Sequence, residues 1–260
     1  MRLVNTDVLA AQIKLYAREL KMPGLSGAFE EVARDAAKAG RGHLESLAAC
    51  LAAEIESRTE HRLAARIKGA RFPALKTFDT FDFSLVPSLQ KGRVLELGSG
   101  AFTRARENVV CLGASGTGKT HVASAIGLSA IYAGARVRFT TAVTLSQELL
   151  AAADDHRLPR YLKAWRSADL VIVDELGYLP LGPGAPPMFQ FFAERYEAGS
   201  VLVTTNLEFS RWTEVFGDAT LTAALLDRLT HHSHVLVFEG ESYRFRESAG
   251  KLTRPRKKTS

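Results

Sequence analysis

The spacing of apolar residues separates the chain into a first part with helical patterns alone and a second part that also contains strand-like runs. Up to about residue 70, apolar side chains recur every three or four positions, as on one face of a helix. Pro23-Gly24 and the glycines at 40 and 42 interrupt the pattern, which predicts helices over residues 6–20, 26–38 and 44–67. We therefore expect residues 1–70 to form a small all-α domain.

From residue 109 onward, short apolar runs alternate with helical patterns. They predict strands at 109–112, 136–140, 170–174, 201–205 and 234–238, and helices at 119–132, 143–152, 159–166, 186–197, 209–215 and 219–230. Before them, nearly alternating aromatic residues over 77–83 predict an extended segment that packs on the core or flanks a nucleotide base. Apolar strands separated by helices are typical of a parallel sheet buried between helices, so residues 71–250 are expected to form an α/β domain.

A glycine-rich loop lies between the first predicted strand and the helix that follows it. It fits the phosphate-loop pattern G-x-x-x-x-G-K-[ST] and consists of Gly113, Ala114, Ser115, Gly116, Thr117, Gly118, Lys119 and Thr120. Its glycines allow backbone N–H groups to surround phosphate oxygens. Lys119 adds a charge for the β- and γ-phosphates, and the Thr120 hydroxyl can ligate Mg²⁺. Since no N-K-x-D guanine-reading pattern occurs, ATP is favoured over GTP.

Polar residues follow two of the predicted strands, at the sheet edge where α/β proteins bind ligands. Asp174, at the end of an apolar strand, is placed to hold Mg²⁺ through water, and Glu175 is placed to orient and deprotonate an attacking water. Asn206 follows another strand and either positions that water or simply ends the strand in a turn. Arg228, on a later helix, either stabilises transition-state charge or forms an ion pair.

The composition is that of an ordinary globular protein. The 260 residues are 46% hydrophobic and 24% charged, and no apolar run approaches the ~18 residues of a membrane span. The first residues lack the apolar core of a signal peptide, and Cys50 and Cys111 are expected to be thiols rather than a disulfide. These features predict a cytoplasmic protein without a membrane partner.

The net charge of +6 is concentrated at the two ends of the chain. Residues 1–76 carry +4, residues 77–250 carry −3, and the tail 251–260, predicted to be disordered, carries +5. Spacing of four places Arg58, Arg62 and Arg66 on one side of a helix, and Lys68 continues this basic run. The run is either a phosphate-contacting ridge for double-stranded DNA or a solvated face in which Glu54 pairs with Arg58.

Several longer stretches resemble one family of nucleotide-binding proteins. The chain resembles the IstB-like transposition helper ATPases of the AAA+ class, relatives of the DnaC helicase loader, over about residues 7–247. The resemblance rests on the phosphate loop through His121, on Leu226-Asp227-Arg228-Leu229 and on Gly240-Glu241-Ser242-Tyr243-Arg244. Its more specific parts are Asp174-Glu175-Leu176-Gly177-Tyr178-Leu179-Pro180 and Trp212-Thr213-Glu214-Val215-Phe216-Gly217-Asp218.

This resemblance implies an ATP-dependent homo-oligomer that captures target DNA and engages its cognate transposase. It implies that the loop through His121 binds ATP, that Lys119, Thr120, Asp174 and Glu175 form the ATPase site, and that Asn206 is a sensor. It further implies that Arg228 is donated to a neighbouring subunit and that the helical N-terminal domain docks a partner. The alternatives are a helicase loader and a DNA-binding scaffold that does not hydrolyse ATP; Glu175 and Arg228 argue against the scaffold.

Overall fold

The computed structural model describes residues 6–240, 242 and 243, so the predicted basic tail at 251–260 lies outside the described residues. The chain divides into two compact units, Met1–Ala65 and Arg66–Ser260. Each unit is described by itself below.

The N-terminal unit is helical. Its helices are α1 (Thr6–Glu19), α2 (Pro23–Ala39) and α3 (His43–Ala70), the last of which ends in the second unit. Gly40 ends α2 in a left-handed conformation (φ 63°), which favours glycine because a Cβ would be strained there. The three helices predicted before residue 70 are confirmed in number and approximate position.

Two polar side chains of α3 fix the start of α2. The Glu54 side chain is buried and accepts hydrogen bonds from Arg58 Nε (2.6 Å) and from the Leu25 amide (3.0 Å). Arg58 Nη2 also donates to the Lys21 carbonyl at 3.0 Å. The Arg58 guanidinium therefore serves the packing of its own unit and forms the pair with Glu54 that the solvated-face alternative predicted.

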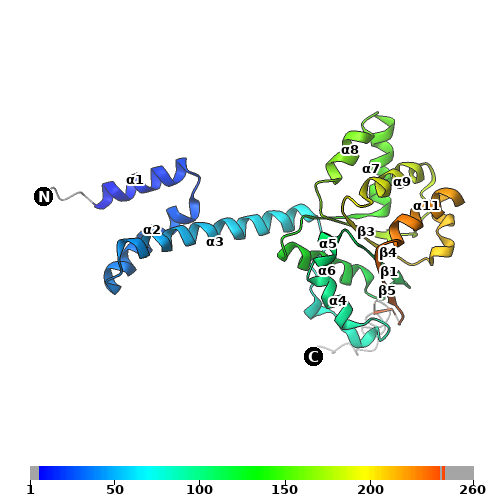
Figure 1. Cartoon of the computed structure of the whole chain (residues 1–260), viewed down its shortest axis with the longest axis horizontal. Coiled ribbons are helices and arrows are strands. Elements are labelled where there is room, and N and C mark those ends of the chain that lie inside the picture. Colours follow the sequence, from blue (N-terminus) through cyan, green and yellow to red (C-terminus); the bar gives the residue numbers. More distant parts are fainter. Residues whose placement is uncertain (1–5, 241, 244–260) are drawn as a thin grey trace, which may run out of the picture. The chain divides into compact units, whose positions relative to one another are not determined.

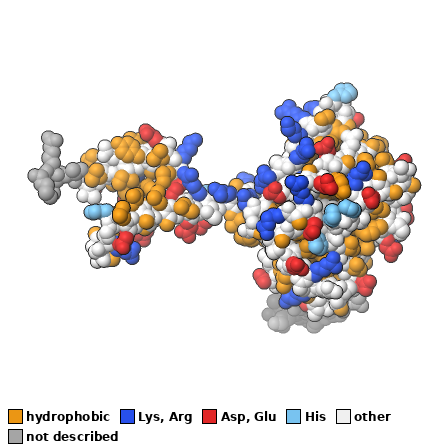
Figure 2. Space-filling model, viewed as in Figure 1, with side chains coloured by type: hydrophobic (Ala, Val, Ile, Leu, Met, Phe, Trp, Pro, Cys, Tyr) orange, Lys and Arg blue, Asp and Glu red, His pale blue; other side chains and the backbone are white. Residues whose placement is uncertain are grey.

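Many apolar side chains of the N-terminal unit remain at its surface. In α3, the exposed fractions are 82% for Leu44, 55% for Leu47 and 66% for Ile55. Figure 2 shows hydrophobic side chains spread over the visible face of this unit. Exposed apolar patches of this kind are typical of surfaces that contact other proteins.

The second unit is built on a five-stranded parallel sheet (Figure 1). Its strands are β1 (Asn108–Gly113), β2 (Val137–Thr141), β3 (Leu170–Leu176), β4 (Ser200–Thr205) and β5 (Ser233–Phe238). Their spatial order is β2-β3-β4-β1-β5, so the phosphate loop after β1 and the carboxylates of β3 lie on either side of the end of β4. The predicted α/β fold with a parallel sheet is confirmed.

Helices pack on the sheet, whose central strand β4 is buried along its whole length. Those that match predicted segments are α6 (Lys119–Tyr132), α7 (Ala142–Asp154), α8 (Leu158–Trp165), α9 (Ala185–Arg195) and α11 (Ala219–Thr230). Cys111 is a buried free thiol within β1, and burial raises its pKa. Cys50 is also a free thiol, half-buried in α3.

Three segments differ from the prediction. Residues 77–83 are not extended but contain the 3₁₀ turn Phe78–Thr80 and the start of a second, Phe83–Leu85. The helix predicted at 209–215 is a 3₁₀ turn, Phe209–Arg211, followed by the one-turn helix α10 (Thr213–Phe216), and Gly217 ends it with φ 74°. Helices α4 (Lys91–Gly98) and α5 (Ala101–Ala105) were missed because glycines interrupt their short apolar pattern.

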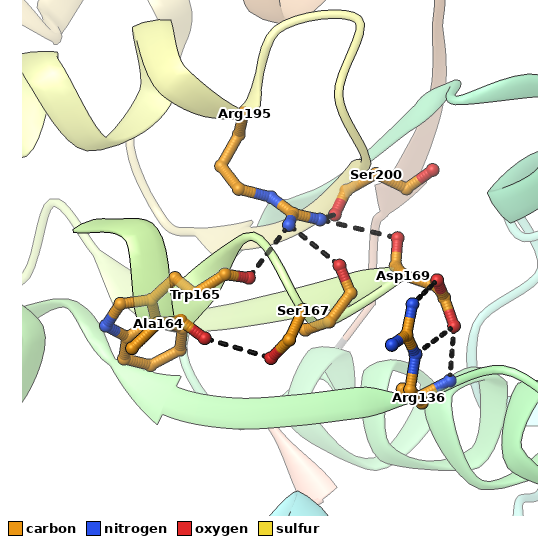
Figure 3. A network of polar contacts seen from close by, with 8 residues as sticks. Arg136, Ala164, Trp165, Ser167, Asp169, Arg195 and Ser200 are labelled. Atoms are coloured by element: carbon orange, nitrogen blue, oxygen red, sulfur yellow. Dashed lines mark hydrogen bonds and ion pairs between the residues drawn. The ribbon is translucent and has the colours of Figure 1, made fainter. Parts of the chain in front are cut away.

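A buried arginine holds the turns at the amino edge of the sheet together (Figure 3). Arg195, only 2% exposed, donates to four carbonyls: those of Trp165 (3.1 Å), Ala168 (2.8 Å), Asp169 (3.3 Å) and Ser200 (2.9 Å). Burial lowers the pKa of Arg195 to about 10, so the guanidinium stays protonated near neutral pH. It thereby joins the end of α8 and the starts of β3 and β4.

We expect Arg195→Met to lower the free energy of unfolding of this unit by about 3 kcal/mol, because buried carbonyls would lose their donors. The measurement is urea unfolding of the full chain. Arg104→Met, at an exposed position of α5, is the matched control and should change stability by less than about 0.5 kcal/mol. Equal stability of the two variants would contradict a structural role for the buried arginine.

Candidate nucleotide-binding site

A cavity of about 510 Å³ opens beside the phosphate loop at the carboxyl end of the sheet. Residues 115–121 form one wall, and Glu175 and Asn206 contribute from the ends of neighbouring strands. The structure therefore brings together most of the residues predicted for the ATP site. Phe81 and Tyr243 line the same cavity.

Close packing explains two glycines of the phosphate loop. Gly116 (φ 83°) and Gly118 (φ 95°) both adopt left-handed conformations. A Cβ on Gly118 would lie 2.6 Å from Phe81 Cε2, and one on Gly116 would overlap Ser242. The Tyr243 amide also donates to the Gly116 carbonyl at 3.0 Å. The loop is thus held on the outside by residues far from it in sequence.

The Lys119 ammonium group lies against the carbonyls at the start of its own loop. It donates to Gly113 O (2.8 Å) and Ala114 O (2.7 Å), and Thr117 Oγ1 also donates to Ala114 O (2.8 Å). Gly113 and Ala114 do not line the cavity themselves. Their carbonyls instead hold the side chains of Lys119 and Thr117, which do line it. The ammonium remains at the cavity wall, where phosphate oxygens would be stronger acceptors than carbonyls.

A hydroxyl and carboxylate cluster joins the loop to β3 and β4. Asp174, 4% exposed, accepts from Thr120 Oγ1 at 3.0 and 3.1 Å and from the Thr204 hydroxyl. Thr204 Oγ1 in turn accepts from the Glu175 amide at 2.9 Å. Thr204 therefore holds the Asp174 carboxylate and the Glu175 backbone, a role that no local sequence pattern indicated.

Glu175 has an uncommon backbone conformation that separates it from its neighbour. Its φ is 61°, and the pairing of β3 with β4 shifts register between Val173 and Leu176. Asp174 is buried, whereas Glu175 is exposed and lines the cavity. Bulges and left-handed non-glycine residues recur beside active sites, at a cost of roughly 1–3 kcal/mol each. Here the irregularity turns Glu175 out of the strand pattern toward the cavity.

His121 connects the first turn of α6 to the preceding segment. Its Nε2 lies 2.9 Å from the Thr77 carbonyl and 3.2 Å from Thr80 Oγ1, and its ring centroid is 5.2 Å from that of Phe81. Phe81 packs on the phosphate loop and also lines the cavity. Contact of this segment with a nucleotide base stays a prediction.

Arg228 lies away from this cavity. Its Nη1 donates to the Ala224 carbonyl (2.8 Å) and its guanidinium lies 5.4 Å from the centre of the Phe189 ring. It shares a small hollow with Asn108, which begins β1, whereas the phosphate loop follows the end of that strand. A six-residue strand spans roughly 16 Å, so Arg228 cannot contact a nucleotide on its own loop.

The donor groups fit Mg²⁺ bound together with a nucleotide. Within residues 6–240 and 242–243, no three His, Cys, Asp or Glu side chains form a metal-binding group. Mg²⁺ in such sites usually takes one or two protein ligands and completes its shell with phosphate oxygens and water. Thr120 and Asp174, in direct contact, supply the oxygen pair that this coordination requires.

Comparison with known proteins identifies the family. The sequence model of the IstB-like ATP-binding proteins matches residues 15–250. The chain belongs to this family. It is 40% identical over 246 residues to an insertion sequence IS21 ATP-binding protein of Pseudomonas aeruginosa, covering 94% of this chain and 93% of the relative. It is 38% identical over 237 residues to the IS5376 ATP-binding protein of Geobacillus stearothermophilus, covering 91% and 94%.

Solved structures share the fold of this IstB-like protein. AMPPCP-bound DnaA from Aquifex aeolicus superposes with a TM-score of 0.55 and 18% identity, over 73% of this chain and 58% of DnaA. DnaI gives a TM-score of 0.51 with 14% identity, over 63% and 91%. The chain thus has the fold of AAA+ nucleotide-binding proteins. None of the described helices is long and apolar enough to cross a membrane.

Proposed function

We propose that this IstB-like protein hydrolyses ATP and that ATP binding and hydrolysis control its assembly on target DNA during transposition. The contact chain from Thr120 through Asp174 and Thr204 to Glu175, beside the phosphate-loop cavity, is the observation that carries the proposal. It supplies in one place the groups that hold a triphosphate and the carboxylate that activates water.

Each residue would have a distinct task in hydrolysis. The loop amides and Lys119 bind the β- and γ-phosphates, and Thr120 and Asp174 hold Mg²⁺, which neutralises charge on the phosphate oxygens. Glu175 accepts a proton from the attacking water, for which its exposed position in the cavity is suited. Asn206, on the same wall, orients that water.

The biological setting is inferred from the relatives. Their names attribute them to insertion sequences and call them ATP-binding proteins. We infer a homo-oligomer on double-stranded DNA that recruits the transposase of its element. The exposed apolar residues of the N-terminal unit support its role in docking that partner.

ATP turnover measured across a titration of duplex DNA, with particle size followed in parallel, tests this function. We expect ATP-dependent assembly on DNA, and capture of a transposase from an insertion sequence of the same type. If the rate of ATP turnover does not change with DNA or transposase but changes when a replicative helicase is added, the protein is a helicase loader. Nucleotide binding without any turnover would identify a scaffold.

Lys119→Ala should weaken ATP binding by roughly a hundredfold or more, because the phosphate charge loses its partner in the cavity. Binding of a fluorescent ATP analogue measures this effect. Lys38→Ala, at an exposed position of α2, is the control and should bind normally. Tight ATP binding by Lys119→Ala would show that the loop does not hold the triphosphate.

A further inference from the structure

The outer side of α8 carries a dense group of basic residues, which we call the α8 basic face. It consists of Arg157, Arg160, Lys163 and Arg166, all of them exposed. Residues 156–168 contain no Asp or Glu. Figure 2 shows Lys and Arg side chains gathered along the upper left margin of the second unit, near the position of α8 in Figure 1.

The two central cations of this face are the least neutralised. Arg157 pairs with Asp155, and Arg166 Nε lies 3.8 Å from Glu194 Oε2. No ion pair or hydrogen bond of the Arg160 or Lys163 side chain is seen in the described part of the chain. An anionic ligand would therefore meet two cations without first displacing an acidic side chain.

The opposite side of α8 is fixed in the core. Leu162 and Trp165 are buried, and the Trp165 ring packs edge-on against Phe191 with 5.6 Å between centroids. The Arg138 guanidinium lies 3.7 Å from the centre of the same indole ring. Arg195 then holds the carbonyls at the end of the helix, as Figure 3 shows. The cations thus project from a helix whose position is determined on its inner side.

The spacing of the face suits an extended row of phosphates. Residues three apart on a helix are displaced by roughly 4.5 Å along the axis and 60° around it. The four basic residues therefore cover roughly 14 Å of length and half of the circumference. Long, flexible side chains spread in this way can reach successive phosphates of one backbone, whereas a compact anion would contact only one or two of them.

We propose that the α8 basic face contacts the phosphate backbone of double-stranded DNA, with Arg160 and Lys163 at its centre. This inference rests on the DNA binding proposed above and assigns it to the second unit. It differs from the ridge predicted at Arg58, Arg62, Arg66 and Lys68, one member of which is already engaged by Glu54 and Lys21.

The decisive measurement is the dependence of duplex DNA affinity on salt for the full-length protein with a non-hydrolysable ATP analogue. Loss of two phosphate contacts should lower the slope of log K against log salt concentration by about 1.8 for Arg160→Ala/Lys163→Ala. The charge-matched control is Arg93→Ala/Arg104→Ala, at exposed positions of α4 and α5, and it should keep the wild-type slope. Arg160→Lys/Lys163→Arg should retain binding, because phosphate contacts need charge rather than one side-chain shape.

Each other outcome rejects the assignment in a distinct way. If wild type binds DNA and both double alanine variants keep its slope, DNA binds elsewhere; a lower slope in Arg62→Ala/Arg66→Ala would then assign binding to the ridge predicted from sequence. If DNA binding persists but transposase capture is lost, the α8 basic face contacts protein. Absence of DNA binding by wild type rejects the proposed function itself. ATP turnover without DNA should be unchanged in all variants and serves as the test of folding.

Discussion

Arg228→Ala is expected to bind ATP normally and to lose about 10³–10⁵-fold in kcat, the range for removal of an arginine finger. The guanidinium lies at the other end of β1 from the phosphate loop, so the expected effect on turnover would be exerted on the nucleotide of a neighbouring subunit. The nucleotide would then lie between subunits, which explains how ATP could drive assembly. Turnover by the assembled protein and ATP binding by equilibrium titration measure the two properties separately.

Mixing two inactive variants tests this shared site directly. Arg228→Ala keeps an intact Glu175, and Glu175→Gln keeps an intact Arg228. In mixed oligomers, some interfaces combine the intact group of each, and these should hydrolyse ATP. Activity should therefore be greatest at intermediate ratios. If the variants co-assemble and no ratio restores turnover, Arg228 has a structural role, through Ala224 and Phe189, and not a catalytic one.

Glu175→Gln should bind ATP but lose about 10²–10⁴-fold in kcat, because an amide cannot accept the proton of the attacking water. Its shape is nearly unchanged, and the backbone contact of residue 175 with Thr204 does not involve the side chain. The variant is therefore expected to accumulate as an ATP-bound assembly on DNA. Single-turnover hydrolysis measures the chemical step, and gel filtration with DNA measures the assembly.

Asp174→Asn is expected to differ from Glu175→Gln in its effect on ATP binding. Asp174 is buried and accepts from two threonine hydroxyls, so its loss should weaken Mg²⁺-dependent ATP binding as well as turnover. Glu175→Gln should affect turnover alone. Near-normal hydrolysis by Glu175→Gln would remove this residue as the base and leave the proposed mechanism without its proton acceptor.

Local sequence patterns were sufficient to predict those parts of the protein that are formed by one short segment of the chain. The phosphate loop, the apolar strands and the two carboxylates after β3 each depend on neighbours in sequence, because glycine conformation and side-chain periodicity act over a few residues. The order of strand and helix also predicted the parallel sheet. For the same reason, the glycine-broken patterns of α4 and α5 gave no usable signal.

Tertiary structure decided which distant residues meet. Phe81 and Tyr243 contact the phosphate loop although they lie far before and far after it in sequence, and Thr204 of β4 contacts the Asp174 carboxylate and the Glu175 amide of β3. Arg195 and Arg228 each lie in the last turn of a helix, but their surroundings differ. Arg195 is buried among four carbonyls, whereas Arg228 lies beside Phe189, far from the phosphate loop of its own subunit. Such contacts depend on how elements pack, since no local spacing encodes a partner many residues away. The sequence by itself determined the phosphate loop, the carboxylates after β3 and the sheet that carries them. Packing alone determined which side chains support those groups and which face of α8 is left basic and exposed.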